Sequence, residues 1–197
     1  MTDILTIKNG RKVVNNGMNE EKVLLDEINL TIREGDFITV LGGNGAGKST
    51  LFNTIAGTLQ LSQGSISFND QLITKDSEEK RARFFSRVFQ DPKMGTAPRM
   101  TVAENLLLAQ KRCQKRKFRL RNLKNQKEDF FRLCQEVGNG LEQHLDTPAG
   151  ELSGGQRQAL SLLMATITAP ELLLLDEHTA ALDPKTAKAL MRLTNQR

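Results

Sequence analysis

The sequence contains no tyrosine and no tryptophan, so its only aromatic side chains are nine phenylalanines among 197 residues. Its two cysteines, Cys113 and Cys134, lack the spacing of a zinc module or of a disulfide-stapled secreted fold. No apolar run is long enough to cross a bilayer, and no apolar leader follows Met1. We therefore expect one compact domain in the reducing cytoplasm, whose contact with a membrane is at most peripheral.

A glycine-rich stretch dominates the first third of the chain. Residues 37–41 are typical of a short buried strand, and apolar residues recur at helical spacing after Thr50. The stretch between them reads Gly42, Gly43, Asn44, Gly45, Ala46, Gly47, Lys48 and Ser49. The glycines let backbone N–H groups converge on an oligophosphate, while Lys48 reaches the β/γ oxygens and the Ser49 hydroxyl ligates Mg²⁺. We predict nucleotide binding here, rather than a turn that merely joins a strand to a helix.

The remaining pattern predicts a mixed α/β chain. Strands are expected over 4–7, 28–32, 87–89 and 172–175, with a hairpin that joins 65–68 to 71–74. Helices are expected over 76–83, 101–109 and 128–137, and from 153 through 167. Thr101 with Glu104, and Ser153 with Gln156, have capping-box spacing. The four leucines at 172–175 predict a strand that is buried on both faces of a parallel sheet.

One segment carries the chain's excess of positive charge. Nine of the seventeen residues from Lys111 to Lys127 are Lys or Arg and none is acidic, so this segment exceeds the whole chain's net charge of +5. A solvated helix face or surface loop is the plainer explanation, and a surface for anionic lipid headgroups or a partner is the alternative. Nucleic acid is disfavoured because Phe118 is the only aromatic residue interleaved there.

The helix expected after Ser153 begins with two glycines. A capping box explains Ser153 and Gln156 but not Gly154 and Gly155, since glycine costs up to about 1 kcal/mol relative to alanine inside a helix. Glycines would let a ligand approach the helix N-terminus closely. We therefore predict a second phosphate-binding helix end on the same chain.

Two carboxylates follow the leucine strand. Ligands of open α/β sheets gather at the carboxyl ends of strands, so Asp176 and Glu177 would face the phosphate site. Asp176 suits an outer ligand of Mg²⁺ or of its water, and Glu177 suits the activation of an attacking water. Two solvated acids at a strand exit are the alternative.

These motifs stand in the order found in the ATP-binding cassette (ABC) ATPases, which the sequence resembles over essentially its whole length. The resemblance implies that residues 42–49 form the Walker A loop and that Gln90 senses both Mg²⁺ and the membrane partner. It implies that Asp176 is the Walker B aspartate and Glu177 the catalytic base. It further implies that residues 153–156 cap the γ-phosphate held by a second subunit, with Asp183 in contact across that dimer.

The resemblance also implies an architecture and a function. It implies a P-loop NTPase core with a mainly parallel sheet, an N-terminal antiparallel β-subdomain and a helical lobe. Residues 1–89 and 158–197 would form the β-subdomain and core, and residues 90–157 the lobe. The chain would be a Mg²⁺-dependent ATPase subunit of a bacterial uptake transporter, paired head-to-tail with a second copy and docked on transmembrane permease subunits at the inner face of the membrane. The alternatives are a soluble ABC ATPase that acts on nucleic acid or ribosomes, and a nucleotide-dependent dimerisation module without turnover.

Two features depart from the family pattern. The family stacks an aromatic side chain on adenine from a position near Val14, but no aromatic residue lies between Met1 and Asp36. We therefore expect weakened ATP affinity or relaxed base choice. The family also continues past the last helix to a strand and a switch histidine, a role for which His144 and His178 stand too early. Because the chain stops at Arg197, we expect a truncated cassette with slow turnover.

Overall fold

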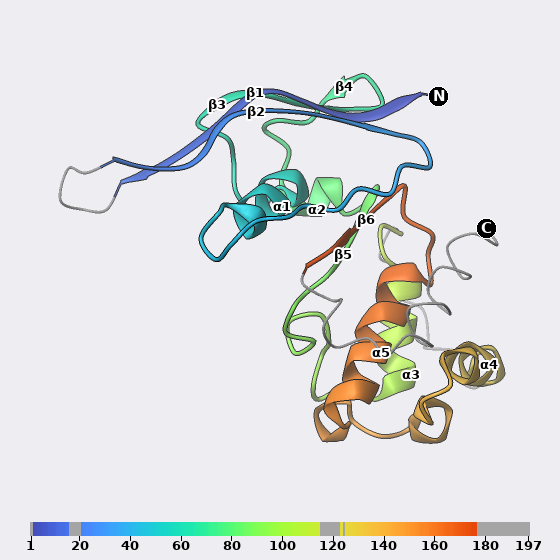
Figure 1. The fold of residues 1–197 in the computed structure, drawn as a ribbon. Helices are drawn as coiled ribbons and strands as arrows, with labels where there is room; N and C mark the ends of the chain where they lie inside the picture. Colours follow the sequence, from blue (N-terminus) through green and yellow to red (C-terminus); the bar gives the residue numbers. More distant parts are fainter. Residues whose placement is uncertain (1, 16–20, 115–122, 124, 177–197) are drawn as a thin grey trace. The chain divides into compact units, whose positions relative to one another are not determined.

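The computed structural model describes residues 2–15, 21–114, 123 and 125–176, which fall into two compact units, Met1–Ala82 and Arg83–Arg197 (Figure 1). The predicted mixture of an antiparallel sheet, parallel strands and helices is confirmed. The assignment of residues 158–197 to the nucleotide-binding core stays a prediction, because residues 177–197 lie outside the described residues.

The first unit is built on a four-stranded antiparallel sheet with the order β2-β1-β3-β4. Strands β1 (Asp3–Asn15) and β2 (Glu21–Arg33) form the long hairpin seen in Figure 1, and β3 (Gln63–Phe68) pairs with β1. The strands predicted at 4–7 and 28–32 lie inside β1 and β2. Both strands extend further because they pair with each other along stretches that show no apolar alternation.

Buried apolar pairs hold this sheet together. Leu5 of β1 lies opposite Phe68 of β3, Ile7 lies opposite Ile66, and all four side chains are almost fully buried. The predicted hairpin between 65–68 and 71–74 is confirmed, although β4 (Gln71–Leu72) is short. Its two turn residues, Asn69 and Asp70, both have positive φ, as a two-residue turn of type I′ requires.

The predicted strand at 37–41 is wrong. The structure assigns no strand there, and the side chains of Phe37 and Leu41 are 77% and 86% exposed. Apolar, β-branched composition favours extended backbone, but a strand also needs a neighbour that pairs with its N–H and C=O groups. In the part of the chain that the structure describes, no strand pairs with residues 37–41.

Two short helices complete the first unit. Helix α1 (Lys48–Ala56) follows the glycine-rich loop, as predicted, and ends at Gly57, which adopts the left-handed conformation. Helix α2 (Glu78–Arg81) lies inside the helix predicted over 76–83 and is shorter than expected.

The second unit contains a pair of parallel strands and three α-helices within its described residues. Strand β5 (Phe85–Val88) begins two residues before the predicted strand and pairs with β6 (Leu172–Leu175), which matches its predicted bounds. The predicted parallel pairing of β6 is confirmed. Its expected burial on both faces is wrong, since only Leu174 is buried. The reason is that β5 is its single paired neighbour among the described residues.

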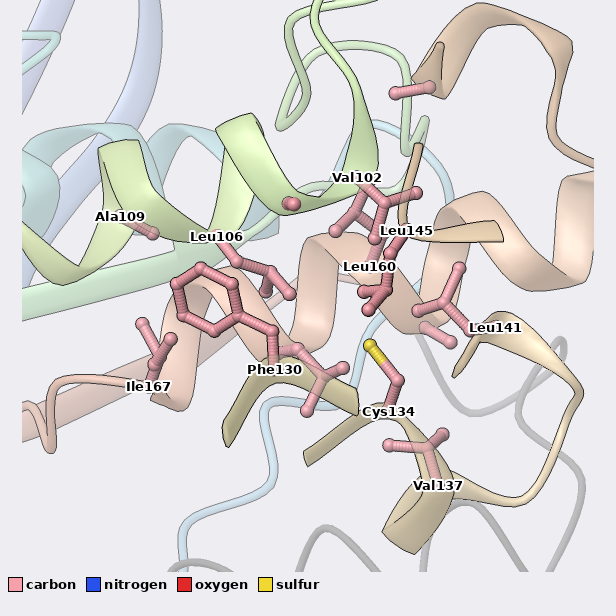
Figure 2. Packing of buried hydrophobic residues seen from close by; sticks show 14 of the residues in the cluster. Val102, Leu106, Ala109, Phe130, Cys134, Val137, Leu141, Leu145, Leu160 and Ile167 are labelled. Atoms are coloured by element: carbon pink, nitrogen blue, oxygen red, sulfur yellow. The ribbon is translucent and has the colours of Figure 1, made fainter. Parts of the chain in front are cut away.

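The helices α3 (Val102–Gln110), α4 (Lys127–Val137) and α5 (Gly154–Thr166) enclose one apolar core (Figure 2). Figure 2 shows Phe130, Cys134 and Val137 on one face of α4, among side chains that include Leu106 and Leu160. The predicted inner face of α4 is confirmed, as is its end at Gly138, where φ is 73°. Two 3₁₀ turns, η1 (Leu141–His144) and η2 (Ala149–Glu151), connect α4 to α5.

The predicted capping box at the start of α3 is confirmed. The Glu104 N–H donates to Thr101 Oγ1 at 3.2 Å, and the Thr101 N–H donates to Glu104 Oε2 at 3.0 Å. Two of the donors that a helix start leaves unpaired are thereby satisfied. Across the described ranges, none of the helices combines the length and apolarity that crossing a membrane requires.

Candidate functional site

The glycine-rich loop turns sharply into α1. Gly45 and Gly47 have φ values of 82° and 84°, in the left-handed region that only glycine adopts easily. Gly47 is the N-cap of α1, and a Cβ there would lie 2.7 Å from the carbonyl oxygen of Leu24. Glycine is therefore required at position 47 by both conformation and space. Because the loop is exposed, the unpaired N–H groups of the first turn of α1 are presented to solvent.

Lys48 folds back over this loop. Its Nζ donates hydrogen bonds to the carbonyl oxygens of Gly42 at 2.7 Å and Gly43 at 2.9 Å. Ser49 is exposed beside it, and no acidic residue lies in the first turn of α1 to repel an anion. The Lys48 cation, the dipole of α1 and the exposed amides of its first turn all favour negative charge at the same place. The loop and the start of α1 therefore fit an oligophosphate.

The second unit places two predicted site residues at one end of its parallel strands. The register pairs Val88 with Leu175, and the Asp176 N–H donates to the Val88 carbonyl oxygen at 3.1 Å. Gln90 follows β5 by two residues and is exposed, whereas Asp176 follows β6 directly and is only 8% exposed. The structure therefore brings Gln90 and Asp176 to the same carboxyl edge.

An ion pair at this edge was not predicted from the sequence. Arg87 Nη2 donates to Asp176 Oδ2 at 2.7 Å, with both side chains about one tenth exposed, and the guanidinium lies 4.7 Å from the centre of the Phe89 ring. A carboxylate buried to this extent requires a cationic or metal partner. One feature of the sequence could have predicted this ion pair. Arg87 is the only charged residue of its strand, and Asp176 directly follows the strand that pairs with it.

The start of α5 forms the predicted capping box. The Gln156 N–H donates to Ser153 Oγ at 3.3 Å, and the Ser153 N–H donates to Gln156 Oε1 at 3.2 Å. Gly154 and Gly155 are exposed, and a Cβ added to either would meet no described atom within 4 Å. Neither glycine has positive φ. Within the described part of the chain, nothing requires glycine at these two positions.

Some predicted site residues cannot be placed. Glu177 and Asp183 lie outside the described residues, as does His178. Among the residues that are described, no three His, Cys, Asp or Glu side chains form a cluster suited to a metal ion. Ser49 belongs to the first unit, while Gln90 and Asp176 belong to the second, so the shared Mg²⁺ site stays a prediction.

Comparisons with known proteins agree with this arrangement. Residues 25–180 match the family described as ABC transporter. The tyrosine transport ATP-binding protein of Clostridioides difficile is 43% identical, in a match that covers 98% of this chain and 76% of that protein. The spermidine/putrescine import ATP-binding protein PotA of Haemophilus ducreyi is 36% identical, and the match covers 86% of this chain and 43% of PotA. This chain therefore spans less than half the length of PotA.

A solved structure extends the similarity to three dimensions. A dimeric ATP-binding cassette in a post-hydrolysis state, bound to ADP and Pi, has a TM-score of 0.80 and 26% identity to this chain. That match covers 98% of this chain and 82% of the solved one. A family match over most of the sequence and a shared fold lead to one conclusion: this chain belongs to the ABC transporter family, as an ATP-binding cassette.

Proposed function

We propose that this chain is the ATP-binding and ATP-hydrolysing subunit that powers a membrane ABC transporter of the import type. Family membership supports ATP hydrolysis, and PotA is named as an import protein. The 43% identical relative is named for tyrosine transport, which makes an amino acid the first substrate to test. The importer's permease and binding subunits, rather than this cassette, would choose that substrate.

The first unit supplies the groups that would bind the phosphates of ATP. Lys48 would exchange its two loop carbonyls for β- and γ-phosphate oxygens, while the first-turn amides of α1 donate to the same groups. Ser49 is positioned on the exposed first turn, where its hydroxyl would hold Mg²⁺. Bound Mg²⁺ would neutralise charge that develops on the phosphates during transfer.

The second unit supplies the groups that act on the γ-phosphate. Asp176 and Gln90 share one strand edge, where Asp176 would hold the metal or its water and Gln90 would sense it. Glu177 comes next in the chain and would accept a proton from the attacking water. Arg87 would hold the Asp176 carboxylate in a fixed orientation through their 2.7 Å hydrogen bond.

The start of α5 is the main evidence for the proposal that two copies of the chain bind nucleotide as a dimer. Gly154 and Gly155 cost helix stability, yet no described neighbour and no backbone conformation requires them. A phosphate that approaches this helix end from a second copy explains both glycines, because a larger or negatively charged side chain would obstruct that approach. Two such contacts related by a two-fold axis close a head-to-tail homodimer, with Asp183 near the same interface.

The proposed partners and location follow from this function. Transmembrane permease subunits would bind the second unit and place the chain at the cytoplasmic face of the membrane. The part of the basic segment at residues 115–122 and 124 lies outside the described residues. Contact of that segment with anionic lipid headgroups stays a prediction.

A substitution at Gly155 tests the two-copy proposal. Gly155→Asp should raise the free energy of unfolding by up to about 1 kcal/mol, because it removes a helical glycine and places an acid in the first turn. Affinity for Mg·ATP should change less than about twofold, since the P-loop of the same chain is intact. Hydrolysis and ATP-dependent dimerisation should be lost, because the carboxylate would repel the γ-phosphate.

The control is Gly155→Ala, which makes a similar helix gain without adding charge. Dimerisation is measured on a sizing column in the Glu177→Gln background, with and without Mg·ATP. An aspartate variant that still forms the ATP-dependent dimer would refute the two-copy proposal. ATPase activity that rises with added RNA and falls with salt would instead favour a cassette that acts on nucleic acid.

A further inference from the structure

A buried arginine lies at the far end of the P-loop helix. Arg81, the last residue of α2, is 1% exposed. Its Nη1 donates to the carbonyl oxygens of Thr54 and Ile55, each at 2.8 Å. Its Nη2 donates to the carbonyl oxygens of Ile73 at 2.6 Å and Thr74 at 3.0 Å. One guanidinium therefore joins two separate segments of the first unit through four backbone acceptors.

The first pair of acceptors belongs to the last turn of α1. Helix carbonyls in this position have no partner within the helix, and the negative end of the helix dipole favours a cation. No basic residue of α1 itself lies in that turn. Arg81 supplies the missing cation. Gly57 makes room for it, because a Cβ there would lie 3.0 Å from Arg81 Cδ and Nε.

The second pair of acceptors follows strand β4. The Ile73 N–H donates to the Ile66 carbonyl oxygen at 2.9 Å, so this segment is itself bonded to β3. At the opposite end of α1, Gly47 packs directly against the carbonyl oxygen of Leu24 in β2. A nine-residue helix is about 13 Å long. Both ends of α1 are therefore held against segments of the same sheet unit.

The four hydrogen bonds of Arg81 depend on the shape of its guanidinium group as well as on its charge. Burial lowers the pKa of Arg81, an effect that the charge of Asp76 opposes. A buried cation is costly, and an apolar side chain would fill the space more favourably if packing were the only requirement. Arginine offers a rigid planar fork that reaches two pairs of acceptors, whereas lysine offers one compact ammonium group.

We propose that Arg81 is a positioning residue for nucleotide binding. By holding the last turn of α1, Arg81 fixes the position of the helix along its axis and its rotation about that axis. It thereby determines where Lys48 and the first-turn amides meet the phosphates. This inference rests on the proposed function, in which α1 and its loop bind Mg·ATP.

The first test replaces Arg81 with lysine, which keeps the charge and loses the fork. In the folded protein, the Kd for Mg·ATP should rise about tenfold, within the range of about 5- to 150-fold that couplings between separate sites show. The Kd for Mg-triphosphate should rise by the same factor, because the loss concerns the phosphates and not the base. The folded fraction is measured by urea unfolding, so that each Kd refers to folded chain only.

The matched control is Leu5→Ala, which destabilises the same unit through a fully buried residue of β1 and leaves the four carbonyl contacts in place. If Arg81 only stabilises the fold, the two variants will lose stability while their folded fractions bind Mg·ATP like the parent. That result would overturn the inference and leave the proposed function intact. A selective rise in Kd for Arg81→Lys supports it.

A second measurement covers the case in which Arg81→Lys does not fold. The guanidinium ¹⁵N–¹H signals of Arg81 in the unsubstituted chain should shift when Mg·ATP is added, while those of the exposed Arg33 in the same unit stay in place. Unchanged Arg81 signals on a chain that binds Mg·ATP would overturn the inference. Absence of Mg·ATP binding by the unsubstituted chain would overturn the proposed function, and this inference with it.

Discussion

Replacing Lys48 with alanine separates the P-loop assignment from every other feature of the chain. The substitution removes the ammonium group that donates to the Gly42 and Gly43 carbonyl oxygens at 2.7 and 2.9 Å. In the nucleotide complex, the same group would donate to the β- and γ-phosphate oxygens. The free loop loses two hydrogen bonds at an exposed site, so the free energy of unfolding should fall by less than about 1 kcal/mol.

The binding loss should be much larger. Hydrogen bonds to charged groups contribute about 1.5–3 kcal/mol each, and Lys48 would make at least two of them to phosphate oxygens. A loss of about 3 kcal/mol or more corresponds to a Kd for Mg·ATP that rises at least about 100-fold.

Isothermal titration with Mg·ATP gives this Kd directly, and thermal unfolding shows that the variant is folded. Lys75→Ala is the matched control, because it makes the same change in net charge at an exposed lysine of the same unit, outside the loop. Near-normal affinity in Lys48→Ala would refute the P-loop assignment. An equal loss in Lys75→Ala would show that overall charge, and not the position of Lys48, controls binding.

Three further predictions concern the hydrolytic step, the binding of the adenine ring and the apolar core of the second unit. Glu177→Gln should bind Mg·ATP normally yet lose hydrolysis, and parent-like phosphate release would remove Glu177 from the chemistry. Val14→Tyr should tighten ATP binding more than triphosphate binding, whereas an equal effect on both would mean that the base stacks elsewhere. Burial raises the pKa of Cys134 to about 12, so at pH 8 a thiol reagent should label the exposed Cys113 in the native protein and Cys134 only after unfolding. Rapid native labelling of Cys134 would contradict the packing shown in Figure 2.

Features that depend on neighbouring residues in the chain were predictable. The two capping boxes, the positive-φ turn at Asn69 and Asp70, and the end of α4 at Gly138 all form between groups a few residues apart. Their geometry follows from side-chain type and spacing, which the sequence displays directly. The loop before Lys48 belongs to the same class, because glycine adopts the positive φ found at positions 45 and 47 without steric cost.

Features that depend on a distant partner were decided by the tertiary structure. Residues 37–41 have the composition of a strand but find no paired neighbour in the described part of the chain. Arg87 and Asp176 are 89 positions apart in sequence, and only the parallel register of β5 with β6 makes them an ion pair. Arg81 looks like one charge in a charged helix until the fold places four carbonyl oxygens around it. The type of a residue determines which kinds of bond it can form. Which distant partner it bonds to depends on how the whole chain packs.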